Sequence, residues 1–250
     1  MDSSFITSVL DPVVSATEIL IAGRRRKTTG RKGVTGHRGG KRRKIRIAVL
    51  LSGTGKTLQN LYDLSKAAKL PAEVVLVIST TSDAFGLKRA EKMRIRNLTI
   101  SRKEAGSLEV FSRHIFAECR KAQVDLVCMA GFLQLVQIPR DFMGRVMNMH
   151  PSLIPAFCGK GFYGDRVHQA VLAAGVKETG CTVHFADNQY DHGPIIRQRT
   201  VSVLEDDTPD TLSARVFAEE CVAYPEAIRL YAEKRLKLEG RRVRVLPLPV

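Results

Sequence analysis

The sequence predicts an α/β fold, in which an open, mostly parallel, Rossmann-like sheet carries helices on both faces. Two observations favour this fold. Apolar strand patterns alternate with amphipathic helical patterns between residues 45 and 130, as right-handed βαβ units require. Residues 48–51 are apolar at every position, which is typical of a strand that is buried on both faces of a parallel sheet.

The alternating elements of this first half follow from their periodicity. We expect strands at residues 45–51, 74–78, 98–100 and 125–130, and helices at residues 56–69, 83–93 and 108–123. Leu58, Leu61 and Leu64 form one stripe of the first helix. Asp83 is expected to cap the second helix. The third helix carries one apolar face, made of Leu108, Phe111, Ile115 and Cys119.

The second half orders its elements differently. We expect a short helix at residues 165–174 and two strands at residues 181–186 and 195–203, which the loop 187–194 joins. A long helical region at residues 207–234 follows, and Pro225 is expected to interrupt it because proline has no N–H donor. Residues 240–250 are expected to form a polar turn and an edge strand, where prolines are tolerated.

Composition favours a soluble protein with reduced thiols. The chain has 250 residues, and no apolar run is long enough to span a bilayer. The first 18 residues lack the basic start of a secretory signal, so we expect a cytoplasmic protein with no membrane contact. Five scattered cysteines without a C-x-x-C pair argue against a disulfide framework and a zinc site. Histidines and cysteines do not occur at metal-ligand spacing, so no metal is expected.

Residues 1–44 are expected to be a basic, disordered N-terminal extension, and residues 45–250 a folded domain. Residues 24–46 hold twelve Lys or Arg and no acid. Such a stretch has almost no apolar surface to offset the entropy of folding. A basic tail can contact nucleic-acid phosphates, but this one lacks aromatic residues that would stack on bases. The alternatives are a solubilising tail and translation from a start codon upstream of the real one.

A glycine-rich turn leads from the first strand into the first helix. Gly55-Lys56-Thr57 resembles the end of a nucleotide-binding P-loop, but the first glycine of that motif would stand at position 50, which is Leu. The third glycine of a dinucleotide-binding motif would stand at position 58, which is also Leu. Free N–H groups at a helix start, with Lys56 beside them, still suit one phosphate. An ordinary tight turn is the alternative.

Residues 147–155 present an amide and an imidazole at the carboxyl end of a strand. Residues 146–149 are expected to form a short buried strand. Asn148 and His150 are two residues apart, so on a strand both side chains project to the same face. Two prolines then force a fixed, extended exit. In open α/β sheets, ligands bind at the carboxyl ends of the strands. The alternative is a core histidine that a loop carbonyl satisfies.

Asp191 is the third candidate for chemistry. It lies in a loop between two apolar strands, and Gly193-Pro194 fix the exit of that loop. A carboxylate near an imidazole holds its tautomer and stabilises its protonated form. The alternative is an aspartate that only forms a turn. Of the other histidines, His184 is expected to be a satisfied core residue on a strand, and His168 lies on a short helix near the same region.

Several stretches resemble the phosphoribosylglycinamide formyltransferases of purine synthesis, within the formyltransferase superfamily. They are residues 47–53, 58–60, 83–87, 129–132, 148–155, 182–185 and 191–196. The pattern Asn-x-His-Pro-Ser-Leu-x-Pro with a later Asp-x-Gly-Pro is specific for the superfamily and less specific for the acceptor. The resemblance runs from about residue 45 to about residue 238 and implies the formyltransferase fold, with residues 45–250 as the catalytic domain.

The resemblance also implies a reaction and a set of site residues. The donor would be 10-formyltetrahydrofolate, and the acceptor would be the amine of glycinamide ribonucleotide. The catalytic residues would be Asn148, His150 and Asp191. The folate would contact Phe132, Leu133, Gln134, Leu135, Val136, Asn148, Asp187 and Asp191. The phosphate of the acceptor would bind at Gly55, Lys56 and Thr57, and Glu220 would help to hold the acceptor.

From these residues we expect direct transfer without a covalent enzyme intermediate, because no Cys or Ser nucleophile is paired with a base. His150, with Asp191 nearby, would carry a proton from the attacking amine to the folate nitrogen. Asn148 would donate its amide N–H to the developing oxyanion. The substrates would be small molecules, and the protein a monomer or a homodimer.

Departures from the family pattern concern mainly the acceptor. Lys56-Thr57 stand where the family usually has Ser-Asn, and Leu133-Gln134 where it has Met-Arg. Residues 156–164 are longer than in the common form and resemble the corresponding loop of formyltetrahydrofolate deformylase, which passes the formyl group to water. That enzyme usually has a second His where this chain has Pro151, and it carries an N-terminal regulatory domain for which residues 1–44 are too short and too polar.

Two further alternatives remain. One is a formyltransferase with another acceptor, such as initiator methionyl-tRNA or a sugar nucleotide. The tRNA enzyme needs a C-terminal β-barrel domain, for which the few residues after residue 238 do not suffice. The other is a non-enzymatic scaffold whose basic tail binds RNA, in which case the Asn-His-Asp trio would be incidental.

Overall fold

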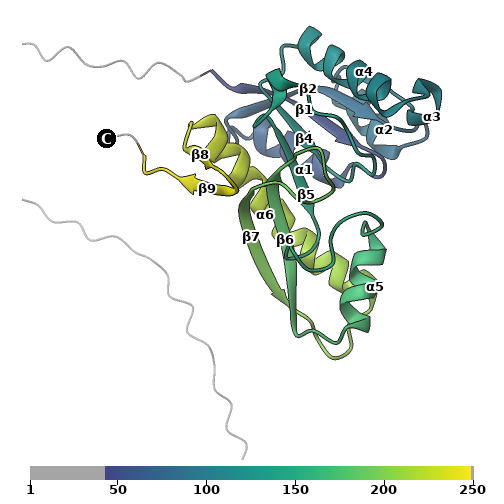
Figure 1. Ribbon diagram of the computed structural model, residues 1–250, viewed down its shortest axis with the longest axis vertical. Helices are drawn as coiled ribbons and strands as arrows, with labels where there is room; N and C mark the ends of the chain where they lie inside the picture. Colours follow the sequence, from purple (N-terminus) through teal and green to yellow (C-terminus); the bar gives the residue numbers. More distant parts are fainter. Residues whose placement is uncertain (1–42, 249–250) are drawn as a thin grey trace, which may run out of the picture. The chain divides into compact units, whose positions relative to one another are not determined.

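The computed structural model describes residues 43–248, and a seven-stranded sheet forms the centre of this part of the chain (Figure 1). Its strands are β1 (Ile45–Leu51), β2 (Ala72–Ser79), β3 (Asn97–Thr99), β4 (Leu126–Met129), β5 (Val146–His150), β6 (Glu178–Phe185) and β7 (Ile195–Ser202). The order is β3-β2-β1-β4-β5-β6-β7, in which β1 to β5 are parallel and β6 and β7 add antiparallel pairings. The predicted α/β class and mostly parallel sheet are confirmed.

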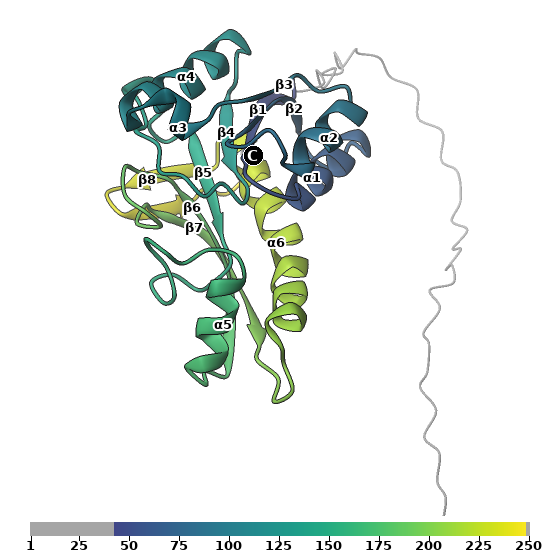
Figure 2. The ribbon, with the colours of Figure 1, turned by 90° about the vertical axis from the view of Figure 1, so that its right-hand side faces the viewer.

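Helices cover both faces of this sheet. The helices are α1 (Lys56–Lys66), α2 (Phe85–Lys92), α3 (Arg102–Ala105), α4 (Leu108–Lys121), α5 (Asp165–Ala173) and α6 (Pro209–Ala232), with a 3-10 turn, η1 (Arg140–Phe142). One hydrophobic core includes residues of α1, α2 and α6, and a second core includes residues of α4. Figure 2 shows α4 across the sheet from α1 and α6.

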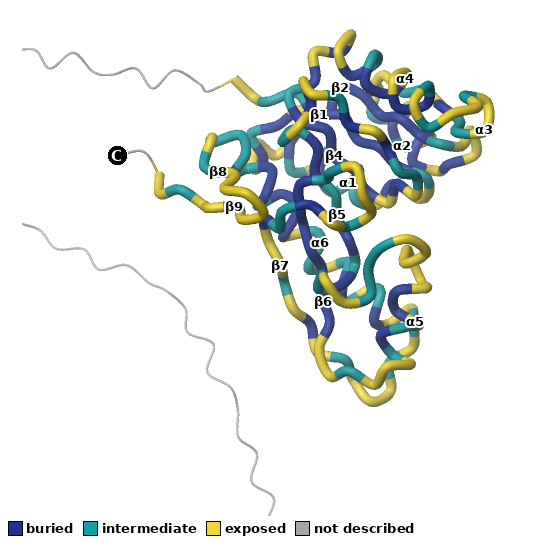
Figure 3. Tube along the Cα trace, in the orientation of Figure 1, coloured by how far each residue is buried: buried dark blue, intermediate teal, exposed yellow. Residues whose placement is uncertain are grey.

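Strand β1 supplies both cores, as its unbroken apolar pattern predicts. Ile47, Val49 and Leu51 pack in the core that contains α1 and α6. Ala48 and Leu50 pack in the core that contains α4. Side chains alternate between the two faces of a strand, so five consecutive apolar residues fill both cores. Figure 3 shows the central strands β1, β4 and β5 as mostly buried.

Helix α6 runs without a break through Pro225, so the predicted interruption is wrong. Proline at position 225 removes the N–H group that would donate to the carbonyl oxygen of Cys221, four residues earlier. The side-chain amide of Asn60, on α1, donates to that oxygen instead, at 3.0 Å. A hydrogen bond from a neighbouring helix therefore replaces the one that proline removes.

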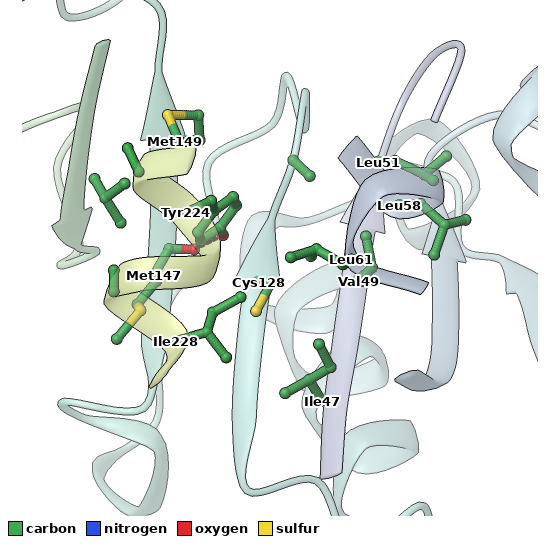
Figure 4. Close-up of a cluster of buried hydrophobic side chains, with 14 of the residues drawn as sticks. Ile47, Val49, Leu51, Leu58, Leu61, Cys128, Met147, Met149, Tyr224 and Ile228 are labelled. Carbon is green, nitrogen blue, oxygen red and sulfur yellow. Dashed lines mark hydrogen bonds between the residues drawn. The ribbon is translucent and has the colours of Figure 1, made fainter. Parts of the chain in front are cut away.

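Tyr224 fixes α6 to β4 and β5. Its side chain is fully buried, and its hydroxyl lies 3.0 Å from the carbonyl oxygens of both Met129 and Met147. Figure 4 shows Tyr224 and Ile228 of α6 beside Met147 of β5 and Cys128 of β4. This anchor holds the helix that carries Glu220 against the strand that carries Asn148.

One of two predictions for shorter segments is wrong. Asp83 does not cap α2: the N-cap is Ala84, and the N–H of Gly86 donates to the carbonyl oxygen of Gly53 at 3.0 Å. The C-terminal residues do form the predicted turn and edge strand, although not in the main sheet. They form a separate antiparallel pair, β8 (Leu236–Glu239) and β9 (Arg242–Val245), because the residues just after α6 supply the partner strand.

No helix within residues 43–248 has both the length and the apolar character needed to cross a bilayer. The predicted N-terminal extension lies almost wholly outside the described residues, so the boundary at residue 44 stays a prediction. Lys44 itself donates to the carbonyl oxygen of Ser65 on α1 at 2.7 Å.

Candidate active site

A cavity of about 1050 Å³ opens at the carboxyl ends of the parallel strands. The turn after β1 contributes residues 53–57, the segment after β4 contributes residues 130–133, and β5 with its exit contributes residues 148–151. This edge of an open α/β sheet is where ligands bind, and the volume matches a small-molecule site. The predicted phosphate turn, Asn148 and His150 therefore line one cavity.

Asn148 lies on β5 with its side-chain amide between two acceptors. Its Nδ2 lies 3.1 Å from Oδ1 of Asp191 and 3.2 Å from Nε2 of His184. The Nδ1 of His184 lies 2.9 Å from the carbonyl oxygen of Phe185, so Nδ1 carries the proton and Nε2 accepts. Both amide hydrogens of Asn148 are therefore engaged. Asn148 can donate to a substrate oxygen only by exchanging one of these partners.

His150 and Asp191 form a buried imidazole–carboxylate pair. His150 is 3% exposed, and its Nδ1 lies 3.5 Å from Oδ2 of Asp191. Its Nε2 lies 2.9 Å from the carbonyl oxygen of Phe157. Burial lowers the pKa of His150, although the charge of Asp191 acts in the opposite direction. The ring is therefore neutral near pH 7, and the carboxylate stabilises it when it takes up a proton.

Asp191 is ionised although it is largely buried. Burial raises the pKa of its carboxyl, but His184, His150 and the backbone N–H of Gly159 more than offset this effect, and the pKa falls below its usual value. The N–H of Gly159 donates to Oδ2 at 2.9 Å. The φ of Asp191 is +50°, a left-handed conformation that Asp tolerates better than most residues. Asp191 is thus a turn residue and also the partner of His150.

Two histidines belong to the site although the sequence pattern did not single them out. His184 is buried and hydrogen-bonded, as predicted, but its partner is Asn148, which it opposes in the β5–β6 pairing. Its Nε2 lies 3.8 Å from Oδ1 of Asp191. His168 on α5 lines the large cavity, is 3% exposed, and its Nδ1 has no hydrogen-bond partner among the described residues. No spacing in the sequence reveals an antiparallel register.

The turn between β1 and α1 offers donors and a cation to an anion. Gly55 has a φ of +70°, and a Cβ there would lie 2.7 Å from the Cα of Gly86, so the turn requires glycine. The N–H groups in the first turn of α1 have no acceptor within the helix. Lys56 is exposed, and its Nζ lies 5.7 Å from the ring centroid of Phe217. Lys56 forms no salt bridge with another described residue.

The residues predicted to contact folate are divided between two adjoining cavities. Phe132, Gln134, Leu135, Val136 and Asp187 line a second cavity of about 50 Å³. Leu133 lines only the larger cavity and is exposed. Phe132, Asn148 and Asp191 line both cavities, and so they stand at the boundary between them.

Glu220 reaches the large cavity from α6. Burial raises the pKa of its carboxyl to about 7. The preceding residue, Glu219, forms an ion pair with Arg199 instead. A carboxyl with a strongly raised pKa in a ligand-sized cavity is a candidate for substrate contact.

Glutamine in place of Glu220 is expected to stabilise the fold at about pH 8 more than at about pH 5. The carboxyl has a pKa of about 7 in the folded state and an ordinary value of 4.5, so the folded state binds more protons between these values. The stability that this proton uptake contributes is present at low pH and is lost as the pH rises through 7. Glutamine cannot ionise and avoids this loss.

Urea unfolding at the two pH values measures the free energy of unfolding of the Glu220→Gln variant. Glu219→Gln is the matched control, because its carboxylate stands next to Glu220 in the sequence and forms an ion pair with Arg199. The control is expected to lose a little stability at both pH values. If Glu220→Gln changes stability equally at both, Glu220 does not titrate near neutrality in the folded protein.

Within residues 43–248, no group of three or more His, Cys, Asp or Glu side chains is placed to hold a metal ion. The five cysteines, all within this part of the chain, form no disulfide.

Comparison with known proteins gives consistent matches. The family described as formyl transferase matches residues 45–228. The trifunctional purine biosynthetic protein adenosine-3 of Drosophila melanogaster is 42% identical over 192 residues, which are 75% of this chain and 14% of that protein. The chloroplastic phosphoribosylglycinamide formyltransferase of Vigna unguiculata is 36% identical over 196 residues, which are 78% of this chain and 63% of that protein.

Among solved structures, glycinamide ribonucleotide transformylase 1 from Symbiobacterium toebii matches with a TM-score of 0.76 and 43% identity. The match covers 82% of this chain and 95% of that one. The chain thus spans less than two thirds of either curated relative and nearly all of the solved bacterial protein.

Proposed function

The chain belongs to the formyl transferase family, and we propose that it transfers a formyl group from 10-formyltetrahydrofolate to the amine of glycinamide ribonucleotide, in de novo purine synthesis. The observation that carries this proposal is the position of Asn148 and Asp191 between two cavities. A group that passes from one bound molecule to another needs its catalytic residues at such a boundary. The names of the relatives agree with this reaction.

The larger cavity suits the acceptor. At one side of it, the turn at residues 55–57 and Lys56 offer backbone donors and a positive charge to a phosphate. Glu220 lines the same cavity, where its carboxyl group would form hydrogen bonds with hydroxyl groups. An acceptor that carries a phosphate, hydroxyls and an amine fits this set of groups.

The smaller cavity suits one end of the donor, but only after it opens. Its volume of about 50 Å³ is far below that of a typical ligand site. Residues 132 and 134–136 line it from the segment after β4, and residues 186, 187 and 189–191 line it from the loop after β6. We therefore assign the pterin ring to this side and expect the loop 186–191, which carries Asp191, to move when the folate binds.

The chemistry follows from the three side chains. The neutral amine attacks the formyl carbon, and His150 takes the amine proton with Asp191 stabilising the protonated ring. Asn148 turns one amide hydrogen from its present partners to the developing oxyanion. Cys158 lies in the adjoining loop, but burial and the charge of Asp191 raise its pKa, so it stays a thiol and is a poor nucleophile. Transfer is direct.

An activity assay with 10-formyltetrahydrofolate, with and without glycinamide ribonucleotide, tests this function. We expect tetrahydrofolate to form only when the amine is present, with one formylated product for each folate consumed. Formate release that does not depend on the amine would assign the protein to the deformylases instead. If another amine is formylated and glycinamide ribonucleotide is not, the protein is still a formyltransferase, but its acceptor is different from the one proposed.

We place this reaction in the cytoplasm, because five free cysteines fit a reducing compartment. The assembly as a monomer or a homodimer stays a prediction. Nucleic-acid contact through residues 24–44 is not part of the proposed function.

A further inference from the structure

The loop after β5 touches both members of the His150–Asp191 pair through its backbone. The carbonyl oxygen of Phe157 lies 2.9 Å from Nε2 of His150. The N–H of Gly159 donates to Oδ2 of Asp191 at 2.9 Å. Neither contact uses a side chain of the loop. Residues 157–159 are called the main-chain clamp below.

We propose that the main-chain clamp keeps the proton of neutral His150 on Nε2 and so makes Nδ1, which faces Asp191, the basic nitrogen of the site. A carbonyl oxygen can only accept a hydrogen bond, so Nε2 has to be the donor and carry the proton. Nδ1 then has a free lone pair. The 3.5 Å between Nδ1 and Oδ2 of Asp191 is longer than a charge-assisted hydrogen bond, as expected when no proton lies between these two atoms.

The proposal says which atom takes the proton during formyl transfer. It rests on the proposed function, because that function identifies the amine that gives up the proton. The amine nitrogen forms a bond to the formyl carbon with its electron pair, and the proton that it sheds binds Nδ1. The ring is then an imidazolium, which donates to Asp191 and to Phe157. The same proton leaves for the folate nitrogen as the bond between that nitrogen and the formyl carbon breaks, and its electron pair stays on nitrogen.

The backbone of the clamp is held in uncommon conformations. Phe157 has a φ of +49°, which is unusual for a bulky residue, and Gly159 has a φ of +94°. The buried hydroxyl of Ser152 donates to the carbonyl oxygen of Ala156 at 2.7 Å and lies 3.3 Å from that of Phe157. Such conformations persist where the surroundings over-determine them, and they cluster at active sites.

Several titratable groups surround His150. Asp191 and His184 act on its pKa from the loop after β6 and from β6 itself. His168 on α5 interacts with it, and Cys158 in the clamp interacts with Asp191. The pH dependence of the rate alone would reflect the titration of all these groups together. The protonated nitrogen has to be identified directly.

Nuclear magnetic resonance of the imidazole nitrogens in the full-length protein makes this identification. At about pH 8, where the ring is neutral, we expect the proton of His150 on Nε2 and a bare Nδ1. The His150→Gln variant assigns the signals by removing them. A proton on Nδ1 would overturn the proposal. This measurement needs no substrate, so its failure is distinct from a failure of the formyl-transfer assay.

Two glycines of the loop provide a matched pair of variants. Gly159 and Gly161 have φ values of +94° and +96°, and a Cβ on either would meet no atom within 4 Å. Alanine therefore strains both positions equally, but only the N–H of Gly159 contacts Asp191. We expect Gly159→Ala to give a mixture of both tautomers of His150, and Gly161→Ala to keep the proton on Nε2.

Kinetics of the Gly159→Ala variant add a second readout. We expect kcat to fall about 10- to 100-fold, as small misplacements of catalytic groups do, with a smaller change in the KM for the acceptor. The same mixture of tautomers in Gly161→Ala would show that strain in the loop, and not the clamp, controls the ring. If Gly159→Ala does not fold, the tautomer in the unchanged protein decides the question.

Discussion

Asparagine in place of Asp191 is expected to lower kcat about 10³- to 10⁴-fold while the protein stays folded, as the same change does in a carboxylate–histidine pair of a serine protease. The reason is twofold. The variant loses the negative charge that stabilises the protonated ring of His150, which lies 3.5 Å away. It also loses an acceptor, because Asn148 and Gly159 each donate to one carboxylate oxygen, and an amide NH₂ cannot accept from either.

Steady-state rates at saturating concentrations of both substrates measure this loss, and thermal unfolding checks that the variant is folded. Asp141→Asn is the matched control. Asp141 pairs with Arg120 at the surface, at 2.8 Å, so its loss is expected to leave kcat unchanged and to cost at most about 1 kcal/mol of stability. Near-normal turnover of Asp191→Asn would show that catalysis does not need the carboxylate of Asp191.

Features that depend on local geometry could be predicted from the sequence. The apolar run of β1 supplies two cores because side chains alternate along a strand. Asn148 and His150 share a face because they are two residues apart on β5. The carboxyl end of the parallel sheet could be expected to carry the site, and the turn at residues 53–57 lines the cavity there as well.

Features that depend on contacts between distant segments could not be predicted in this way. His184 accepts from Asn148 because of the antiparallel register of β5 and β6, which no local pattern encodes. Helix α6 continues past Pro225 because Asn60, on another helix, satisfies the carbonyl group that proline leaves free. The main-chain clamp uses backbone atoms and no side chain, so the residue types of the loop do not reveal it.

The arrangement of Asn148 has a consequence for catalysis. Both of its amide hydrogens bind protein acceptors, Oδ1 of Asp191 and Nε2 of His184. An oxyanion that develops near Nδ2 would compete with a neutral imidazole nitrogen and with a carboxylate. The imidazole is the weaker acceptor, because hydrogen bonds to charged groups are stronger than those to neutral ones. We therefore expect Asn148 to leave His184 and to keep its bond to Asp191 as the reaction proceeds.

Asn148→Ala is accordingly expected to lower kcat about 10²- to 10³-fold, the usual effect of removing one oxyanion donor. If the bond to the oxyanion exists only in the transition state, kcat and kcat/KM should fall equally. Steady-state kinetics with each substrate varied in turn measure both quantities. Full activity of this variant would exclude Asn148 from the chemistry.

A double-mutant cycle separates the two ways in which Asn148 can act. If Asn148 only orients Asp191, then Asn148→Ala has no further effect once Asp191 is already asparagine. If Asn148 also donates to the oxyanion, the second substitution lowers the remaining rate again, by about tenfold or more. We expect the second result, because Nδ2 has two hydrogens and the bond to Asp191 uses only one of them.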